Sequence, residues 1–303
     1  MYNTPNYSVD LVNSTFCSKV FGGQVKEAQE AASLYIRDRL YEDGLLRRLF
    51  EPVPVTPDQL DPLMDSDRPS IIVEIQPDAP AATFVPFKGT ADRGYFKANR
   101  FRVPFAQVES ERISKNRFEL ETIRMPITDW LKEHQVKMIQ EQEDSQFLGT
   151  VNDIITRNLS GKQAVDATGM SFKDAFTAGM RALNAMRVPY GKVLMNKNTF
   201  LESLKLKVEE IGFKPQEDRF NRGVDGESSF LGLDVVTTIK DDLVKDGEMF
   251  FFSQKDYFCK FFVQADCSLF MKTEGPMIEF HTYESIGIGI GNVNGVAKVS
   301  WNG

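Results

Sequence analysis

The sequence has few of the residues from which enzymes most often build catalytic and metal sites. Only two histidines and three cysteines occur among its 303 residues, and they lack the paired spacing of a zinc site. The GxSxG motif of serine hydrolases and the HExxH motif of zinc proteases are absent as well. We interpret His134 as a solvated helix residue and His281 as a half-buried strand residue. We therefore predict no catalytic residues, no cofactor and no metal.

The chain also lacks long apolar runs. No run approaches the roughly 18 residues that a membrane span requires. The first ten residues, MYNTPNYSVD, have neither the basic start nor the apolar stretch of a secretory signal. Three cysteines (Cys17, Cys259 and Cys267) without disulfide spacing are typical of a reduced chain that uses them as small apolar residues. We expect a protein that works in a reducing environment, away from membranes.

Acidic residues outnumber basic ones, and the formal net charge is −7. This argues against a protein that wraps nucleic acid with its whole surface, because such binding requires a basic face. It does not argue against a container that holds nucleic acid. Hydrophobic residues make up 42% of the chain and charged residues 26%, a balance typical of globular proteins.

A glycine-rich run near the end of the chain, at 287–291 (GIGIG), superficially resembles a dinucleotide-binding fingerprint. Turn and strand residues follow it, and not the helix that would hold a pyrophosphate, so we reject a dinucleotide site. Alternate glycines in a strand leave one face bare. We predict that another backbone packs closely against this face while the isoleucines fill the other side.

Four segments have the composition and spacing of helices. The longest, residues 127–159, contains no proline and has apolar residues mostly at steps of three and four. At 1.5 Å per residue it would be a rod of about 50 Å. A second helix at 171–187 begins at Ser171, with Asp174 completing a loose capping box. The other two helices are expected at 25–42 and 198–207.

Residues on both sides of the middle helices have strand patterns. We predict a short buried strand at 71–75 and a long β-hairpin within 82–124, with turns at Lys88-Gly89 and Arg93-Gly94 and a further turn candidate at 114–116. The hairpin has charged as well as apolar faces, so we expect it to need a neighbour to lie on. Later strands are predicted at 191–196, 232–239, 247–254, 256–264 and 277–291. The fold class is therefore α+β.

Charge is unevenly distributed around the predicted hairpin. Residues 51–87 contain seven acids and one base, a net charge of −6, whereas residues 88–124 have a net charge of +4 and residues 1–50 are neutral. The two charged stretches are either solvated surfaces or complementary surfaces of neighbouring copies, which would set register more than affinity. The candidate contact residues are Phe16, Phe21 and Leu34 in the arm and Arg100, Arg102 and Arg117 in the hairpin.

The order of these parts resembles the major capsid fold of tailed bacteriophages, which encapsulin shells and the herpesvirus capsid floor share. Two stretches carry most of the similarity, SFKDAFTAGMRALNAMRVPYGKVLMNKNTFLESLK and LFMKTEGPMIEFHTYESIGIGIGNVNGVAKVSW. The resemblance implies an N-terminal arm with a helix at 1–68, an extended loop with its flanking strand at 69–125, a peripheral domain with a spine helix at 126–190, an axial domain at 191–270, and C-terminal strands at 271–303 that return to the peripheral domain.

By this resemblance the chain is a structural protein and not an enzyme. Many copies would form the hexamers and pentamers of an icosahedral shell around phage double-stranded DNA. The implied partners are further copies of the chain, portal, scaffold and cementing proteins, and DNA bound without sequence specificity. The implied location is the virion, after assembly in the host bacterial cytoplasm. Two alternatives remain: the shell of an encapsulin-type compartment, or a soluble enzyme with an unrecognised site.

Overall fold

The computed structural model describes most of the chain. The described residues are 18–19, 24, 26–30, 32, 44–63, 66–75, 84–87, 89–90, 99–122, 134–135, 137–157, 161–206 and 228–302. The helices are α3 (Leu45–Leu49), α4 (Arg117–Thr122), α6 (Lys137–Arg157), α7 (Phe172–Ala185) and α8 (Lys197–Leu201). The strands are β1 (Val53–Pro54), β2 (Asp61–Leu63), β3 (Ser66–Ile75), β4 (Asn99–Pro104), β5 (Ala106–Glu109), β6 (Ile113–Asn116), β7 (Ala164–Asp166), β8 (Tyr190–Asn196), β9 (Ser228–Phe230), β10 (Leu233–Thr238), β11 (Glu248–Ser253), β12 (Cys259–Glu274), β13 (Met277–Ile290) and β14 (Val296–Ser300). Helices and sheets both contribute, so the predicted α+β class is confirmed.

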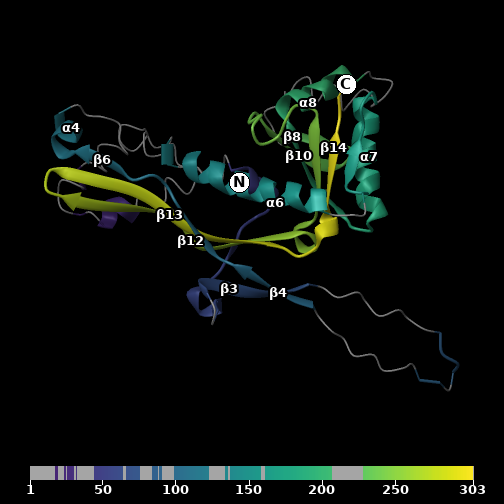
Figure 1. Ribbon diagram of the computed structural model, residues 1–303, viewed down its shortest axis with the longest axis horizontal. Helices are drawn as coiled ribbons and strands as arrows, with labels where there is room; N and C mark the ends of the chain where they lie inside the picture. Colours follow the sequence, from purple (N-terminus) through teal and green to yellow (C-terminus); the bar gives the residue numbers. More distant parts are fainter. Residues whose placement is uncertain are drawn as a thin grey trace.

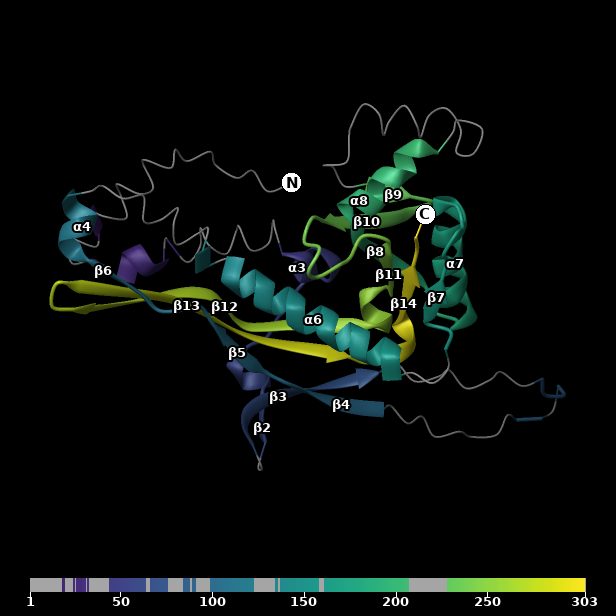
Figure 2. The ribbon, with the colours of Figure 1, turned by 45° about the horizontal axis from the view of Figure 1, so that its top comes forward.

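A six-stranded sheet forms the compact end of the molecule, at the right of Figure 1. Its strand order is β7-β14-β11-β8-β10-β9, with β8 and β10 parallel and β11 antiparallel to both of its neighbours. α7 packs on β11 and β14, while α6 contacts β14 and α3 contacts β10 (Figure 2). A separate apolar core lies on each face of this sheet.

The run Phe250-Phe251-Phe252 in β11 shows how the sequence produces this two-sided burial. Successive side chains of a strand point to opposite faces, and all three rings are at most 1% exposed. Phe251 lies edge-on to Phe176 of α7, with ring centroids 5.0 Å apart. Phe252 packs on Phe147 of α6 at 5.7 Å. The strand therefore has apolar partners on both faces and joins the two cores.

The caps of α7 and α8 follow from their sequences. The backbone amide of Asp174 donates to Ser171 Oγ at 3.2 Å, and the Ser171 hydroxyl donates to the Asp174 carboxylate at 2.8 Å, so the predicted capped helix is confirmed. At α8 the Asn196 side chain accepts from the Asn198 amide. The strands predicted at 191–196, 232–239 and 247–254 correspond to β8, β10 and β11.

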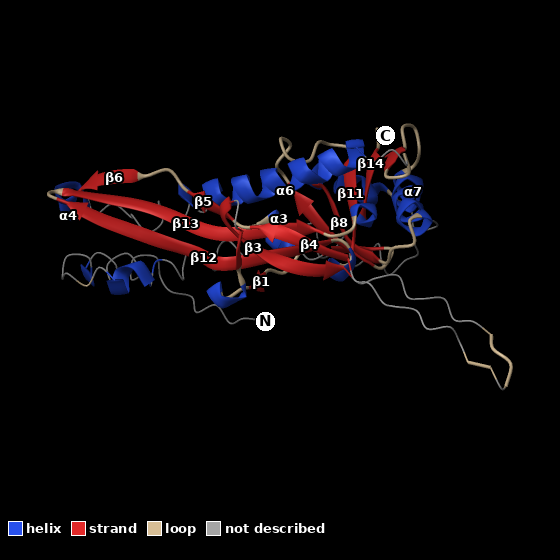
Figure 3. Cartoon of the chain, turned by 60° about the horizontal axis from the view of Figure 1, so that its bottom comes forward, coloured by secondary structure: helices blue, strands red, loops and turns tan. Residues whose placement is uncertain are grey.

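A five-stranded sheet is built on the long hairpin of β12 and β13, which extends away from the compact end (Figures 1 and 3). The two strands pair antiparallel, from Cys259 opposite Ile290 to Glu274 opposite Met277. β5 and β6 both pair with β13, and β1 pairs with β12. At roughly 3.3 Å per residue the 14 residues of β13 span about 46 Å. β12 is much longer than the strand predicted at 256–264.

α6 lies along this hairpin (Figure 2). Its 21 residues span about 31 Å. His134 and Gln135 form a π-helical turn ahead of it, and the remaining residues of the predicted helix 127–159 lie outside the described residues. His134 is exposed, as predicted. Among the described residues no helix is long and apolar enough to cross a membrane.

A three-stranded sheet, β2-β3-β4, corrects the predicted hairpin. β4 pairs antiparallel with β3, from Ser70 opposite Pro104 to Ile75 opposite Asn99. The extended loop therefore runs between residues 75 and 99, and its first strand precedes residue 82. The turn candidate at 114–116 is wrong, because these residues belong to β6 and pair with β13. β3 is also not fully buried, since Ile72 on its outer face is 41% exposed.

Candidate assembly interface

The base of the extended loop is held by a small apolar cluster of its own. β3 and β4 cross the sheet of β12 and β13 on the face opposite to α6 (Figure 2). The buried members of this cluster are Val55, Val73, Val103, Phe105 and Phe262, with Leu60, Ile71 and Phe101 partly buried around them. The loop thus starts from a fixed platform, because both of its strands are packed where they leave the body.

Two glycines of β13 make room for this platform. A Cβ placed on Gly289 would come within 2.4 Å of Val103 Cγ2, and one placed on Gly287 would come within 3.2 Å of Phe105 Cε2. Contacts under 3.0 Å are not seen for real Cβ atoms, so residue 289 has to be glycine for β4 to lie where it does. The predicted bare glycine face is confirmed. The groups that fill it are side chains, and not a second backbone as predicted.

The isoleucines that alternate with these glycines, Ile286, Ile288 and Ile290, point to the other face. Ile286 is buried, and Ile288 and Ile290 pack against the core beneath α6. β13 is therefore packed on both faces, by the base of the extended loop on one and by the long helix α6 on the other.

The tip of the loop is the most exposed apolar part of the described chain. The side chains of Phe84 and Phe87 are 109% and 111% exposed, and Val85 is 47% exposed. A hydrogen bond from the Gly89 amide to the Pro86 carbonyl, at 2.7 Å, closes a turn here and agrees with the turn predicted at Lys88-Gly89; the turn predicted at Arg93-Gly94 lies outside the described residues. In Figures 1 and 2 the tip projects well away from every helix and sheet.

The structure brings together two of the three candidate arginines. Arg100 and Arg102 are exposed on the outer face of β4. Arg100 already has a partner in the same chain, since its guanidinium lies 2.6 Å from the Glu74 carboxylate on β3. Arg117 is exposed at the start of α4, near the far end of the long hairpin (Figure 2). Part of the negative charge of residues 51–87 is therefore already paired with positive charge of residues 88–124 within one chain.

The three arm candidates, Phe16, Phe21 and Leu34, lie outside the described residues. The described part of the predicted helix at 25–42 is helical at 26–30 and packs on the long hairpin. Ala28 and Ala32 are buried there, and the Gln29 side chain donates to the Met271 carbonyl at 3.3 Å. We keep the role of these candidates as a prediction.

A buried ion cluster ties the segment after this helix to the body. The Arg47 guanidinium, on α3, donates two hydrogen bonds to Glu143 of α6, at 3.0 and 3.2 Å. It also donates to Glu284 of β13 at 2.9 Å and to Asp266 of β12 at 3.1 Å. The side chains of Arg47, Glu143 and Glu284 are fully buried. One cation therefore links α3, the long helix and both strands of the hairpin.

The cluster holds more carboxylates than cations, and Glu284 compensates by keeping its proton. Burial, followed by the nearby Glu143 carboxylate, raises the pKa of Glu284 to about 9. Its Oε1 accepts no hydrogen bond from any described donor, so a proton there costs no existing interaction. At neutral pH the neutral acid leaves Arg47 facing Glu143 and the partly exposed Asp266.

The next residue of α6 fixes the start of α3. Asp144 accepts hydrogen bonds from the amides of Leu46 at 3.0 Å and Leu45 at 3.4 Å, and its carboxylate lies 3.3 Å from Lys240 Nζ. A carboxylate at the first turn of a helix satisfies amides that have no partner within the helix. Burial raises the pKa of Asp144, and these donors oppose the shift. The partners of Glu143 and Asp144 are far away along the chain, so no local sequence pattern predicts these contacts.

The two described cysteines and His281 are used for packing. Cys259 and Cys267 are buried, and burial raises the pKa of the Cys259 thiol to about 12 and that of Cys267 further. The thiolate, which is the nucleophile, is therefore scarce at neutral pH. His281 is a half-buried strand residue, as predicted, with its ring 4.9 Å from that of Phe270. These groups serve the fold.

Comparison with known proteins shows which fold this is. No protein-family model matches the sequence, and no curated protein is significantly similar to it. Among solved structures, the virus-like particle from Pyrococcus furiosus aligns over 87% of this chain and 97% of its own, with a TM-score of 0.53 and 16% identity. The mature capsid of bacteriophage PhiM1 aligns over 86% and 87%, with a TM-score of 0.55 and 9% identity. The capsid of a native GTA particle aligns over 85% and 90%, with a TM-score of 0.54 and 13% identity.

The chain has the tailed-phage major capsid fold. The fold predicted from the order of elements is thus confirmed, with α6 as the long helix of the capsid fold and β3-β4 as the base of its extended loop. The division at residues 68, 125, 190 and 270 stays a prediction. β12 runs across residue 270, α7 packs on the six-stranded sheet, and the closing strand β14 pairs with β11 and β7 of that sheet.

Proposed function

We propose that this chain is a major capsid protein: many copies would assemble into the hexamers and pentamers of an icosahedral shell that encloses phage double-stranded DNA. The observation that carries the proposal is the extended loop. Its base is packed on β13, whereas its aromatic tip is not shielded by any other part of the chain that the structure describes. A monomer would leave these rings in water, and a shell would bury them between copies.

The fold comparisons support the same conclusion. Shell-forming proteins of phages, of a GTA particle and of a virus-like particle share the fold over more than four fifths of this chain. The buried ionisable groups Arg47, Glu143 and Glu284 link α3, α6 and β13 to one another. We therefore infer a structural role and not a catalytic one.

An encapsulin-type compartment is the second candidate, because the virus-like particle aligns with a TM-score of 0.53, against 0.55 for the PhiM1 capsid, and over a larger share of its own chain. Both candidates predict a closed shell, and they differ in its contents. We favour the phage capsid, with the extended arm at 1–68 and the separate basic loop as further contacts between copies. Portal, scaffold and cementing proteins are then expected partners, DNA contact would be non-specific, and the protein would reside in the virion after assembly in the host bacterial cytoplasm.

The test is expression of the full chain, followed by size-exclusion chromatography, electron microscopy and extraction of the contents. Closed shells or rings of five and six subunits are the expected result, and co-expression with the phage scaffold and portal proteins should yield DNA-filled particles. Protein cargo in place of DNA would favour the compartment. A monomer that stays monomeric at high concentration, in precipitant and with scaffold would contradict both.

A further inference from the structure

We propose that Glu143 of α6 and Glu284 of β13 share one proton, and that loss of this proton opens a bulge in β12 while the rest of the chain stays folded. The proton then controls whether α3 is attached to β12. This motion lies within one chain, so it goes beyond the proposed shell function and can be tested on unassembled protein. It requires a carboxyl pair that the fold holds together, a weak segment beside the pair, and a link between the two.

The carboxyl pair is held on a single nitrogen of Arg47. Nη2 of this arginine donates to Glu143 Oε1 at 3.0 Å and to Glu284 Oε2 at 2.9 Å. All three side chains are fully buried, where two neighbouring carboxylates cannot both be charged without a large cost. Burial, then the charge of Glu143 and a hydrogen bond with it, raise the pKa of Glu284 against the opposing charge of Arg47. One proton shared by the pair is therefore the stable state at neutral pH.

Among the described residues, the charged groups around the pair do not replace that proton. Asp266 of β12 adds a third carboxylate to Arg47, at 3.1 Å. Lys240 supplies a further cation, but its Nζ is paired with Asp144, the residue after Glu143, at 3.3 Å. Uncharged groups complete the surroundings: Val108 of β5 opposite Glu284, the ring of Phe261 beside Arg47, and the thiol of Cys267. Loss of the proton therefore adds negative charge to a buried cluster that already has more carboxyl groups than cations.

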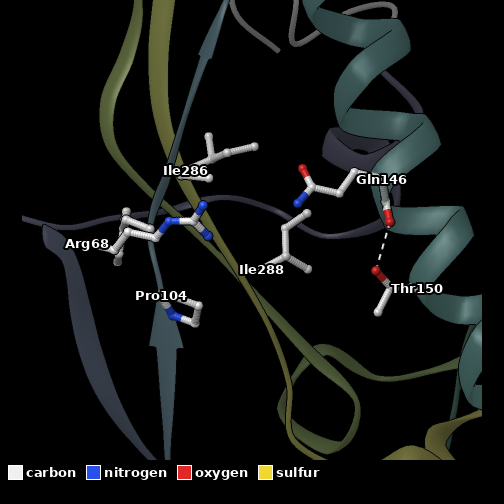
Figure 4. Close-up of a pocket in the computed structure, with 8 residues that line it drawn as sticks. Arg68, Pro104, Gln146, Thr150, Ile286 and Ile288 are labelled. Carbon is white, nitrogen blue, oxygen red and sulfur yellow. Dashed lines mark hydrogen bonds between the residues drawn. The ribbon is translucent and has the colours of Figure 1, made fainter. Parts of the chain in front are cut away.

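Packing between α6 and β13 is incomplete next to the pair. Gln146 lies one turn after Glu143 on α6, and Ile286 lies two residues after Glu284 on β13. Both line a pocket of about 130 Å³ between the helix and the strand (Figure 4). A void gives the atoms that line it no packing partner on one side. The helix can therefore shift slightly against the strand when the pair becomes repulsive.

The weak segment is a bulge in β12. Regular pairing with β13 is interrupted between Val263 and Ala265 and again between Ala265 and Ser268. A bulge leaves residues unpaired and disrupts the ladder, and such a segment opens at a lower free energy than a regular ladder does. Asp266 lies inside the bulge, and its side chain is 18% exposed, whereas the carboxyl pair is fully buried. Water therefore reaches the cluster at the bulge.

Arg47 links the pair to the bulge, because Nη1 of the same guanidinium donates to Asp266 at 3.1 Å. When the shared proton leaves, Glu284 gains a full charge and competes with Asp266 for Arg47. Asp266 is the carboxylate that water can solvate, so it separates from the guanidinium and the bulge opens toward solvent. α3 then keeps its contacts with α6 and β13 and loses the one with β12.

Thiol labelling detects the opening. In a Cys17→Ser background the two remaining cysteines are both buried in β12. Cys267 lies within the bulge, whereas Cys259 pairs with Ile290 in the regular part of the ladder. The full chain receives a short pulse of iodoacetamide at pH 7 and at pH 10, and mass spectrometry gives the ratio of labelled Cys267 to labelled Cys259. Every exposed thiol reacts faster at high pH, because the thiolate is the nucleophile, so the ratio and not the rate reports the opening.

The ratio should rise at least about tenfold, because pH 10 lies above the pKa of Glu284, about 9, and pH 7 lies well below it. Glutamine at either position of the pair should abolish this rise. The amide of Glu284→Gln can donate to Glu143 as the shared proton does, and the amide of Glu143→Gln can donate to Glu284, so neither variant has a shared proton to lose. Glu274→Gln, at an exposed residue of the same hairpin, should keep the full rise. Circular dichroism at both pH values shows whether each variant is folded.

A ratio that stays constant from pH 7 to pH 10 in the parent chain would overturn the proposal. So would equal labelling of both cysteines at pH 10, which indicates unfolding of the whole chain. A full rise in Glu143→Gln would do the same, because Glu284 then titrates without a shared proton.

If neither glutamine variant folds, hydrogen exchange of the parent chain decides. After correction for the intrinsic rate, exchange at residues 264–268 should accelerate at high pH more than exchange at 259–263. Equal acceleration of the two segments would contradict a local opening. None of these outcomes depends on shell formation, so the proposed function is tested separately.

Discussion

Gly289 of β13 lies directly beneath Val103 of β4, so close that a Cβ on the glycine would be 2.4 Å from the valine Cγ2. The absence of a side chain on one strand therefore sets where the extended loop leaves the body. A methyl group at this position must push β4 outward or distort β13.

The first prediction follows from this contact. Gly289→Ala should lower the free energy of unfolding by about 1–3 kcal/mol, the usual cost of overpacking a core. Gly149→Ala is the matched control, because no atom lies within 4 Å of its added Cβ and it sits inside α6; alanine there should stabilise by about 1 kcal/mol. Urea unfolding measures whether the free energy of unfolding falls in Gly289→Ala and rises in Gly149→Ala. Equal effects would contradict the close packing of β4 on β13.

The second prediction concerns the buried arginine. Arg47→Met leaves buried carboxylates without their cation and should cost about 3–5 kcal/mol. The neighbouring Arg48→Met should cost less, about 1 kcal/mol, because the half-buried Arg48 side chain is not bonded to the carboxylates of this cluster. Chemical unfolding at pH 7 measures the difference. Near-equal losses would show that the cluster does not hold α3.

The third prediction is a pH dependence. Glu284 holds its proton up to a pKa of about 9 in the folded chain, against an ordinary value of 4.5. The folded state then binds more protons than the unfolded state between these values, so its stability should fall as pH rises from about 4.5 to about 9. Glu284→Gln should flatten this slope and be the more stable variant at pH 9. Glu274→Gln, exposed at the tip of the same hairpin, should keep the wild-type slope; a steep slope in Glu284→Gln would contradict the assignment.

The fourth prediction tests the exposed arginines. Reversing Arg100, Arg102 and Arg117 to Glu should reduce the yield of shells at low salt without unfolding the monomer, because all three are exposed. Arg102→Glu alone should have a larger effect than Glu74→Gln, which breaks only an exposed pair worth less than about 1 kcal/mol. Added salt should reduce the difference in shell yield between the variants, because it screens exposed charges. Unchanged assembly of the triple variant at low salt would refute charge complementarity between copies.

The fifth prediction concerns the arm. Deletion of residues 1–23 should leave a monomer that unfolds cooperatively, because α3 and the cluster around Arg47 lie beyond the deletion. The same variant should assemble poorly. Circular dichroism and particle yield measure the two effects, and loss of cooperative unfolding would contradict the arm assignment.

Much of the fold could be predicted because its signals are local. The cap at Ser171, the run of three phenylalanines in β11 and the alternate glycines of β13 each depend on residues close together in the chain. The turn predicted at 114–116 failed for the opposite reason. Ser114, Lys115 and Asn116 have turn-like composition, but pairing with β13, more than 150 residues later, overrides local preference.

The candidate site was less predictable, and Arg47 shows why. Arg47 and Arg48 are adjacent and chemically identical in the sequence, yet one is fully buried and the other is half-buried. The carboxylates that distinguish them lie 96, 219 and 237 residues further along. No local pattern contains that information. Similarly, the aromatic tip was expected only as part of a hairpin, because its exposure depends on what the rest of the chain leaves uncovered.

The attachment of Arg47 also has a mechanical consequence. Tension applied to the N-terminal segment would reach the hairpin at the contact of Gln29 with Met271 and then reach α3, from which it would pass through one guanidinium into α6, β12 and β13 together. Asp144 adds a second attachment, through the amides at the start of α3. A pull on the arm would therefore move α6, β12 and β13 together. Because β3 and β4 pack on β13, the base of the extended loop would move with them.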